Sequence, residues 1–303
     1  VDKLVSIFET MAPGALGPGL AAAGVFFVAW LVARATKRPT ILRLGVLLAA
    51  ATGFSVGFVV ILRWPELPLA RSTDGWYWVA WLGPAAVILG LLEQGLRMPV
   101  LARLGVRLLA SAGAAWLILS PVAQVPSDRG LVVAVAAAGS TLLWSLLAAA
   151  RQDEPPERSG LPAAMAPGLA AAVLAFFAGT ASMGQVTGGL SAALSAPLAM
   201  AIVLRVKGTS VAAPAAAVTA LVFGGLLVSA YGYLNYGGAI YVPASVPLLL
   251  LGGAVLGLVL ARLLPTSLGR IPGAVIVSLP PLTLSAIAAW IADAHALPPN
   301  PYG

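Results

Sequence analysis

The sequence predicts an all-α protein, a polytopic transmembrane helix bundle of about ten spans. Two numbers predict this class, because 60% of the 303 residues are hydrophobic and only 9% are charged. Soluble domains carry about 25% charged residues, so a chain this poor in charge needs lipid as its main solvent. A membrane-spanning helix takes about 20 residues. The whole chain, residues 1–303, is therefore expected to form a single integral membrane domain.

Ten apolar segments are the expected spans, since charged residues, Pro/Gly turns or aromatic residues bound each of them. They cover residues 14–33, 44–62, 76–92, 105–122, 130–150, 163–182, 189–204, 211–232, 246–264 and 272–292. Only a short Gly/Ser/Gln stretch interrupts residues 163–204, which therefore fit either two full spans or one span and a re-entrant turn. Residues 1–12 place apolar residues at helical spacing, which predicts a short amphipathic helix on the outer membrane surface.

The distribution of basic residues predicts the orientation. Thirteen of the 17 Lys and Arg residues, Arg103, Arg107 and Arg158 among them, are assigned to connections on one side, and four to the other. Cytoplasmic loops are enriched in Lys and Arg. Both termini are therefore expected on the outer, periplasmic side of a plasma membrane. The preference for Arg over Lys and the abundance of Ala indicate a bacterial inner membrane.

A short match between two distant segments indicates an internal duplication. Residues 18–27 read PGLAAAGVFF and residues 167–177 read PGLAAAVLAFF. The repeat halves would be residues 14–150 and 163–292, joined by a cytoplasmic linker at 151–162. Five spans per half give the halves opposite orientations, which is the inverted repeat of many secondary transporters. The alternative is chance similarity, because Ala/Leu/Gly-rich spans resemble one another by composition alone.

The residue inventory argues against catalysis, cofactors and nucleic acid. The chain has no Cys and one His, which excludes disulfides, thiolate metal sites and a bis-histidine haem within one chain. None of the ten acidic residues lies deep in an expected span, where proton relays and intramembrane enzymes place such groups. The net charge of +7 follows from membrane topology without a nucleic-acid partner. We therefore expect no enzyme, no metal and no cofactor.

Weakly polar groups and helix breakers are the candidates for a substrate path. Two adjacent prolines remove backbone hydrogen bonds in the tenth span, and discontinuous helices of this kind form transporter sites. The polar stretch 180–189 fits either a re-entrant turn that lines a path or a tight outer loop. The alternative at the prolines is a structural kink. The expected path residues are Thr180, Ser182, Gln185, Ser278, Pro280, Pro281 and Thr283.

Two glycine pairs have the spacing that lets helix backbones approach closely in lipid. Gly53 with Gly57 and Gly253 with Gly257 are therefore expected to pack helices. A pore lined by hydroxyls and exposed carbonyls is the alternative for these faces.

A tyrosine-rich stretch lies on the outer side. It combines tyrosine, asparagine and glycine, which suits a partner surface or a vestibule cover, and an interfacial belt with a turn is the alternative. Its candidate contact residues are Tyr231, Tyr233, Asn235, Tyr236 and Tyr241.

Two functions from different classes fit these observations. The first is a transporter or channel for a small neutral or weakly charged solute, supported by the repeat, the prolines and the polar stretch. The second is a non-catalytic structural or anchoring subunit of a larger membrane complex. It would bind other membrane subunits or copies of itself, in addition to the lipid bilayer.

Overall fold

Lipid offers no hydrogen bonds to a backbone, so an apolar chain satisfies its N–H and C=O groups within helices. The computed structural model describes residues 2–62, 76–96, 98–121, 126–150, 156–176, 181–206, 210–236, 243–265 and 270–295. Over these ranges the chain is a helix bundle without strands. Its helices are α1 (Asp2–Thr36), α2 (Pro39–Leu62), α3 (Trp76–Gly95), α4 (Val100–Leu119), α5 (Pro126–Ala148), α6 (Pro156–Phe176), α7 (Ala181–Val203), α8 (Ala212–Tyr236), α9 (Ser245–Leu263) and α10 (Arg270–Ala294).

Nine of the helices found in the described ranges are long and apolar enough to cross a membrane. The remaining helix, α6, packs against α7, α8, α9 and α10. None of the side chains described for α6 is exposed. A helix enclosed by other helices does not meet lipid, so it needs less apolar surface than a peripheral span. The prediction of a polytopic membrane bundle is confirmed.

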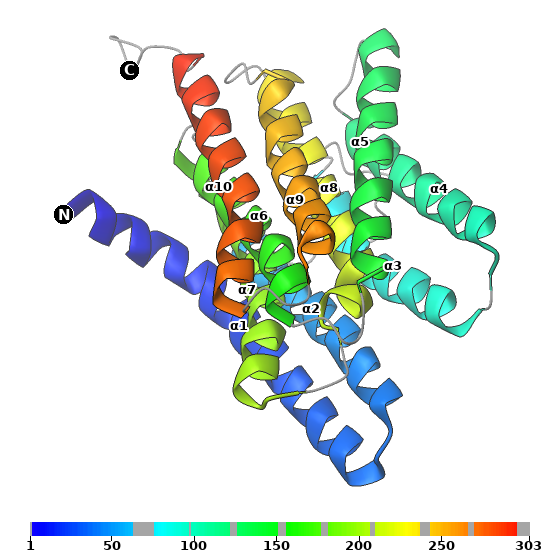
Figure 1. The fold of residues 1–303 in the computed structure, drawn as a ribbon. Coiled ribbons are helices and arrows are strands. Elements are labelled where there is room, and N and C mark those ends of the chain that lie inside the picture. Colours follow the sequence, from blue (N-terminus) through cyan, green and yellow to red (C-terminus); the bar gives the residue numbers. More distant parts are fainter. Residues whose placement is uncertain are drawn as a thin grey trace.

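Successive helices run in opposite directions through the bundle (Figure 1). The ends of α1, α3, α5, α7 and α9 therefore lie near the starts of α2, α4, α6, α8 and α10, at the bottom of that view. Most basic side chains in the described ranges belong to this end, which we call the basic end: Arg34, Lys37, Arg38, Arg43, Arg103, Arg107, Arg158, Arg205 and Arg262.

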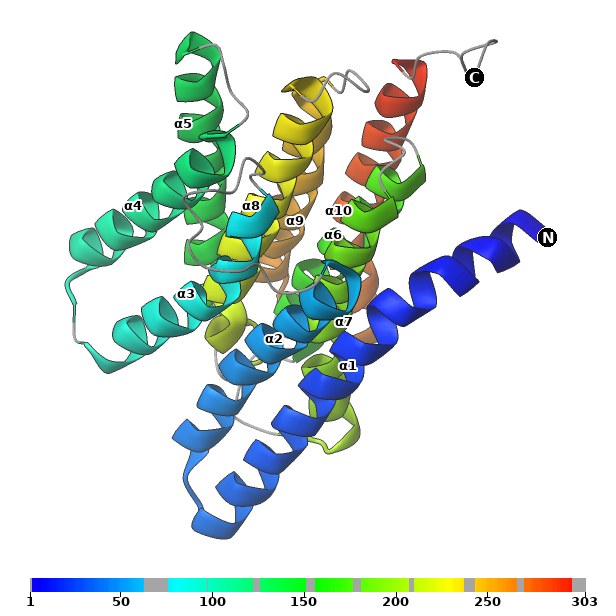
Figure 2. The same cartoon turned by 180° about the vertical axis from the view of Figure 1, so that it is seen from behind.

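The core of the bundle is α8. It packs against all the helices from α2 to α7 and against α9, and almost all its residues from Ala212 to Gly232 are buried. Its Ala, Gly and Val side chains are small enough for this many neighbours to approach. By contrast, α1 packs on α2 and α7, and only a small part of its span Gly14–Thr36 is buried. The α1–α2 hairpin extends beyond the other helices at the basic end in both views (Figures 1 and 2).

Three expected boundaries are wrong. Residues 2–13 are continuous with α1 and do not form a separate surface helix, because a membrane helix tolerates prolines such as Pro18. The linker expected at 151–162 is shorter, since α6 begins at Pro156, a residue that suits the first turn of a helix. Arg103 belongs to α4, which begins at Val100, and not to the loop expected before residue 105.

The polar stretch 181–189 is neither a loop nor a re-entrant turn, because it forms the first turns of α7. The glycines of this stretch allow neighbouring helices to pack closely against α7. A Cβ atom at Gly184 would lie 2.6 Å from the Cβ of Ala175 in α6. A Cβ atom at Gly189 would lie 3.1 Å from the carbonyl oxygen of Gly14 in α1. Small residues here let α7 fit between α1 and α6.

Candidate functional site

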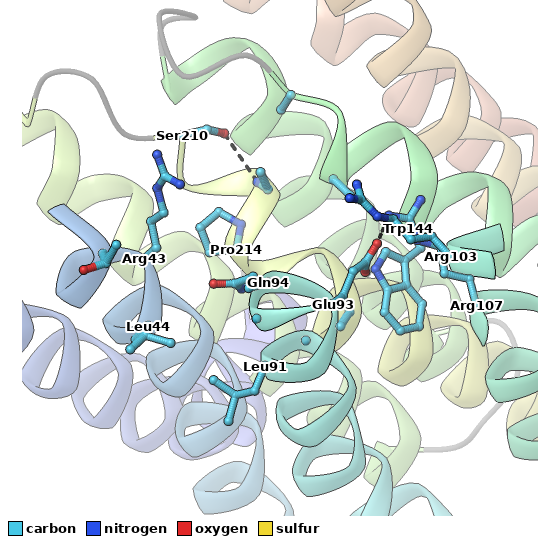
Figure 3. Close-up of a pocket in the computed structure, with 17 residues that line it drawn as sticks. Arg43, Leu44, Leu91, Glu93, Gln94, Arg103, Arg107, Trp144, Ser210 and Pro214 are labelled. Atoms are coloured by element: carbon cyan, nitrogen blue, oxygen red, sulfur yellow. Dashed lines mark hydrogen bonds and ion pairs between the residues drawn. The ribbon is translucent and has the colours of Figure 1, made fainter. Parts of the chain in front are cut away.

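A cleft of about 560 Å³ opens at the basic end between α2, α3, α4, α5 and α8. Arg43 lies on one side, Arg103 and Arg107 lie on the other, and Gln94 lies between them (Figure 3). Along α8 the lining runs from Ser210 before the helix to Ala217. The cleft thus reaches about one to two turns into the bundle.

Helix geometry brings its charged groups together. Arg103 and Arg107 are four residues apart in the first turns of α4, so their side chains share one face of that helix. Glu93 lies in the last turn of α3, which is antiparallel to α4, and Arg43 lies in the second turn of α2. The cleft therefore collects three guanidinium groups and one carboxylate from three helices.

The carboxylate is paired with the innermost arginine. Arg107 forms an ion pair with Glu93, and the two side chains are only 9% and 17% exposed. Arg107 also donates to the hydroxyl of Ser145 at 2.9 Å and lies 5.8 Å from the ring centre of Trp144. The Ser145 hydroxyl in turn donates to the carbonyl of Thr141 at 2.7 Å. This network ties α3, α4 and α5 together at the inner wall of the cleft.

The other two arginines have no partner among the described residues. Within the ranges that the structure describes, Arg43 and Arg103 form neither an ion pair nor a side-chain hydrogen bond. The Nε atom of Arg103 is buried without a partner. Among the described lining residues, Glu93 neutralises one of the three cations, which leaves two positive charges in excess.

Two arginines elsewhere at the basic end are bound to backbone. Arg158 donates to the carbonyl oxygens of Leu264 and Pro265, at 3.5 and 3.0 Å, where α9 has just ended. Arg262 donates to the carbonyl of Leu146 in the last turn of α5. Free carbonyls at a helix C-terminus attract cations. These arginines therefore stabilise helix ends.

The start of α8 adds to the positive potential. Ser210 precedes the helix, and its hydroxyl accepts a hydrogen bond from the backbone N–H of Ala213 at 3.4 Å. Ser210, Ala213 and Pro214 line the cleft. A helix N-terminus carries about half a positive charge, so α8 reinforces the field of the arginines.

The arrangement of charges in the cleft suits the binding of an anion. Across the described part of the chain, no group of three or more His, Cys, Asp or Glu side chains lies close enough together to hold a metal ion. Arginine guanidinium groups donate hydrogen bonds and stay protonated, so they do not serve as general bases. The cleft can attract and hold an anionic group.

The expected path residues lie elsewhere, and those that are described do not line this cleft. Thr180 falls outside the described residues. Ser182 is exposed at the start of α7, and Gln185 lies against Gly14 of α1. In α10, Ser278 donates to the carbonyl of Ala274, and exposed Thr283 donates to the carbonyl of Leu279.

The two prolines do not break α10, which is helical from Arg270 to Ala294. The discontinuous span expected there is therefore wrong, and each proline costs the helix one hydrogen bond. The residue four positions before Pro281 is Val277, whose carbonyl loses its usual donor. A Cβ atom at Gly257 of α9 would lie 2.8 Å from this oxygen. Close packing between α9 and α10 thus shields the unpaired carbonyl of Val277 from lipid.

The glycine pairs lie at helix contacts. A Cβ atom at Gly53 would lie 2.8 Å from the carbonyl oxygen of Pro18 in α1, and one at Gly57 would lie 2.7 Å from the Pro18 Cγ atom. A Cβ atom at Gly253 would lie 2.9 Å from the Cα atom of Pro281. At each of these positions a side chain would push two helices apart.

The tyrosine-rich stretch is described only in part. Tyr231 lies on α8 beside an apolar groove of about 360 Å³ between α5, α8 and α9. Tyr233, Asn235 and Tyr236 belong to the last turns of α8, but their side chains, like the whole of Tyr241, lie outside the described residues.

The arginines of the cleft and Glu93 are functional candidates that the sequence analysis did not identify, because it places Arg43, Glu93 and Arg103 in loops and Arg107 at the start of a span. The signal available was the i, i+4 spacing of Arg103 and Arg107 next to Glu93. No protein-family model, curated protein sequence or solved structure matches this chain.

Proposed function

We propose that this protein is a transporter that carries a small solute across a bacterial inner membrane and admits it through the cleft at the basic end. The observation that carries this proposal is the cleft itself, because it opens into a bundle of apolar spans and is lined by charged and polar groups. Unpaired arginines that face a cleft can bind a solute, whereas the packing of the helices does not use their hydrogen-bond donors.

The basic end is proposed to face the cytoplasm. Lys and Arg are enriched in cytoplasmic connections, and most basic side chains that are described gather at this end. The cleft would then be open to cytoplasmic solutes. Both termini would lie on the periplasmic side, because an even number of crossings returns the chain to the side where it started.

An inverted repeat of α1–α5 and α6–α10 is part of this proposal. Corresponding neighbours support it, since α1 packs on α2 as α6 packs on α7, and α4 packs on α5 as α9 packs on α10. A two-fold axis between the halves would exchange α2 with α7 and α3 with α8. Both of these pairs of helices are in contact. Against the symmetry, α6 packs on α9 and α10, whereas α1 has no comparable contact with α4 or α5 over the described residues. A rotation of about 180° about an axis in the membrane plane should superpose α1–α5 on α6–α10, and halves that cannot be overlaid would contradict the repeat.

Cysteine accessibility tests the transport proposal without knowledge of the solute. The chain has no cysteine, so a single introduced thiol gives an unambiguous signal. The test position is Ala217→Cys at the inner end of the cleft. The reference positions are two exposed residues at opposite ends, Arg38→Cys and Ala244→Cys. Each variant is treated in right-side-out and inside-out vesicles with a membrane-impermeant thiol reagent.

A transporter exposes its site to both sides in turn. We expect Ala217→Cys to react in both kinds of vesicle, Arg38→Cys only from the cytoplasmic side and Ala244→Cys only from the outside. Reaction of Ala217→Cys from the cytoplasmic side alone would contradict transport and favour the anchoring subunit. Labelling of Arg38→Cys only from the outside and of Ala244→Cys only from the cytoplasmic side would contradict the proposed orientation.

A further inference from the structure

We infer that the cleft at the basic end binds an anionic group, a carboxylate or a phosphate, between Arg43 and Arg103. As the description of a transported substrate this rests on the proposed function, and it narrows the neutral or weakly charged solute expected from the sequence. The same chemistry is found in soluble organic anions and in the headgroups of anionic lipids. Both sources are separated in the experiment below.

The charge balance is the first argument. Three guanidinium groups and one carboxylate line the cleft, and the carboxylate of Glu93 is already paired with Arg107. Like charges four residues apart on a helix repel, so Arg103 beside Arg107 is unfavourable in the empty cleft. An anion bound at Arg103 removes this repulsion.

The unused hydrogen-bond donors are the second argument. Arg43 and Arg103 have no side-chain partner in the described ranges, and the Nε atom of Arg103 is buried. Arg158 and Arg262, at the same end of the bundle, both donate to backbone carbonyls. Guanidinium groups match carboxylate and phosphate oxygens in bidentate geometry. The two unpaired arginines are therefore placed to receive a ligand from opposite sides of the cleft (Figure 3).

The size and the remaining walls are the third argument. A volume of about 560 Å³ lies within the range of pockets that enclose small molecules. Leu44, Leu91 and Trp144 provide apolar surface, while Thr40 and Gln94 add uncharged polar groups. The positive end of α8 faces the same space. A small anion with an apolar portion fits this lining.

The binding experiment uses the full chain in nanodiscs of phosphatidylcholine. Inorganic phosphate and succinate are titrated separately, with chloride at matched ionic strength as reference, and the thermal unfolding midpoint is followed. In a second arm, phosphatidylglycerol replaces part of the lipid and no soluble anion is added. The variants are Arg43→Gln and Arg103→Gln. Arg38→Gln is the matched control, because it removes one exposed arginine at the same end outside the cleft.

We expect phosphate or succinate to raise the unfolding midpoint of the wild type more than chloride does. The half-saturating concentration should increase by about tenfold in Arg43→Gln and in Arg103→Gln, as the loss of a charge-assisted hydrogen bond predicts. Arg38→Gln should match the wild type, and Arg103→Lys should retain part of the binding. The same pattern with phosphatidylglycerol alone identifies a lipid headgroup as the source of the anion.

Two results would overturn the inference: no stabilisation by any of these anions, or equal stabilisation in the cleft variants and the wild type. Cysteine accessibility at Ala217 is independent of anion binding. Labelling of Ala217→Cys from both sides without anion binding would contradict the anion site and support transport. Anion binding with labelling from one side only would support the anion site and contradict transport.

Discussion

The seam between α6, α9 and α10 and the cleft between α2, α3, α4, α5 and α8 both lie toward the basic end, but only the seam is closed. At the seam, a Cβ atom on Gly257 would lie 2.9 Å from the Cβ atom of Pro162 and 2.8 Å from the Val277 carbonyl. Arg158 lies beside it and donates to carbonyls just past α9. At the cleft, Arg43 and Arg103 donate to no carbonyl of the described residues. Arg158 lies near the C-terminus of α9 and donates hydrogen bonds that join two helices. Arg43 and Arg103 face other arginines, whose positive charges repel, and the helices there stay apart.

The largest effect is expected for Glu93→Ala in the cleft. It leaves the buried guanidinium of Arg107 without its counter-ion, and the loss of one partner of a buried pair costs about 3–5 kcal/mol. The free energy of unfolding, measured by denaturant titration in mixed micelles, should fall by this amount. Exposed Asp293→Ala is the control and should change it by less than about 0.5 kcal/mol.

The double variant Glu93→Ala with Arg107→Leu separates charge from packing. Because it removes both buried charges, it should be more stable than Glu93→Ala alone. A double variant that is less stable than the single one would mean that the Glu93 side chain acts by filling space, and the charge contrast between cleft and seam would be lost.

A smaller effect is expected for Gly257→Ala at the seam. The new methyl group would meet backbone and a proline ring at less than 3 Å, and overpacking of this kind costs about 1–3 kcal/mol. Gly113→Ala in α4 is the matched control, because no atom lies within 4 Å of the position of its Cβ. Equal stability of the two variants in the same titration would show that the seam is loosely packed.

The smallest effects compare one arginine from each region. Arg158→Gln removes two hydrogen bonds to carbonyls and should cost about 1–2 kcal/mol. Arg103→Gln removes none from the described chain and should change the free energy of unfolding by less than about 0.5 kcal/mol in the absence of an anion. A loss as large for Arg103→Gln as for Arg158→Gln would break the distinction between the two regions.

Much of the fold could be read from local sequence. Every expected apolar segment overlaps a helix, and the ends differ where polar residues continue the helix, as at Arg103 and Arg158. Local hydropathy predicts the ends of the apolar segment that lies in lipid. The helix itself can extend further, because polar residues beyond this segment form hydrogen bonds and contacts with other parts of the protein. The polar start of α7 was read as an interruption for the same reason, since its glycines signal a turn locally and a close contact in the bundle.

The candidate site was much less accessible to sequence reasoning. The pairing of Arg103 and Arg107 on one helix face is visible in their spacing, but Arg43 in α2 and Ser210 before α8 are distant from them in the chain. The expected path residues were chosen as the most polar groups near the spans. In the bundle, Ser278 and Thr283 satisfy carbonyls of their own helix, which removes the donors that made them candidates.

The sequence by itself determined the solvent, the helical class and the approximate position of each span, because a charge-poor chain must hydrogen-bond its backbone locally in lipid. It also determined that basic residues collect at one end. Only the tertiary structure decided which arginines are used up, since the partners of Arg158 lie 106 and 107 residues away along the chain. Whether a guanidinium reaches a helix C-terminus or an open cleft depends on helix packing, and no local pattern in the sequence encodes that distance.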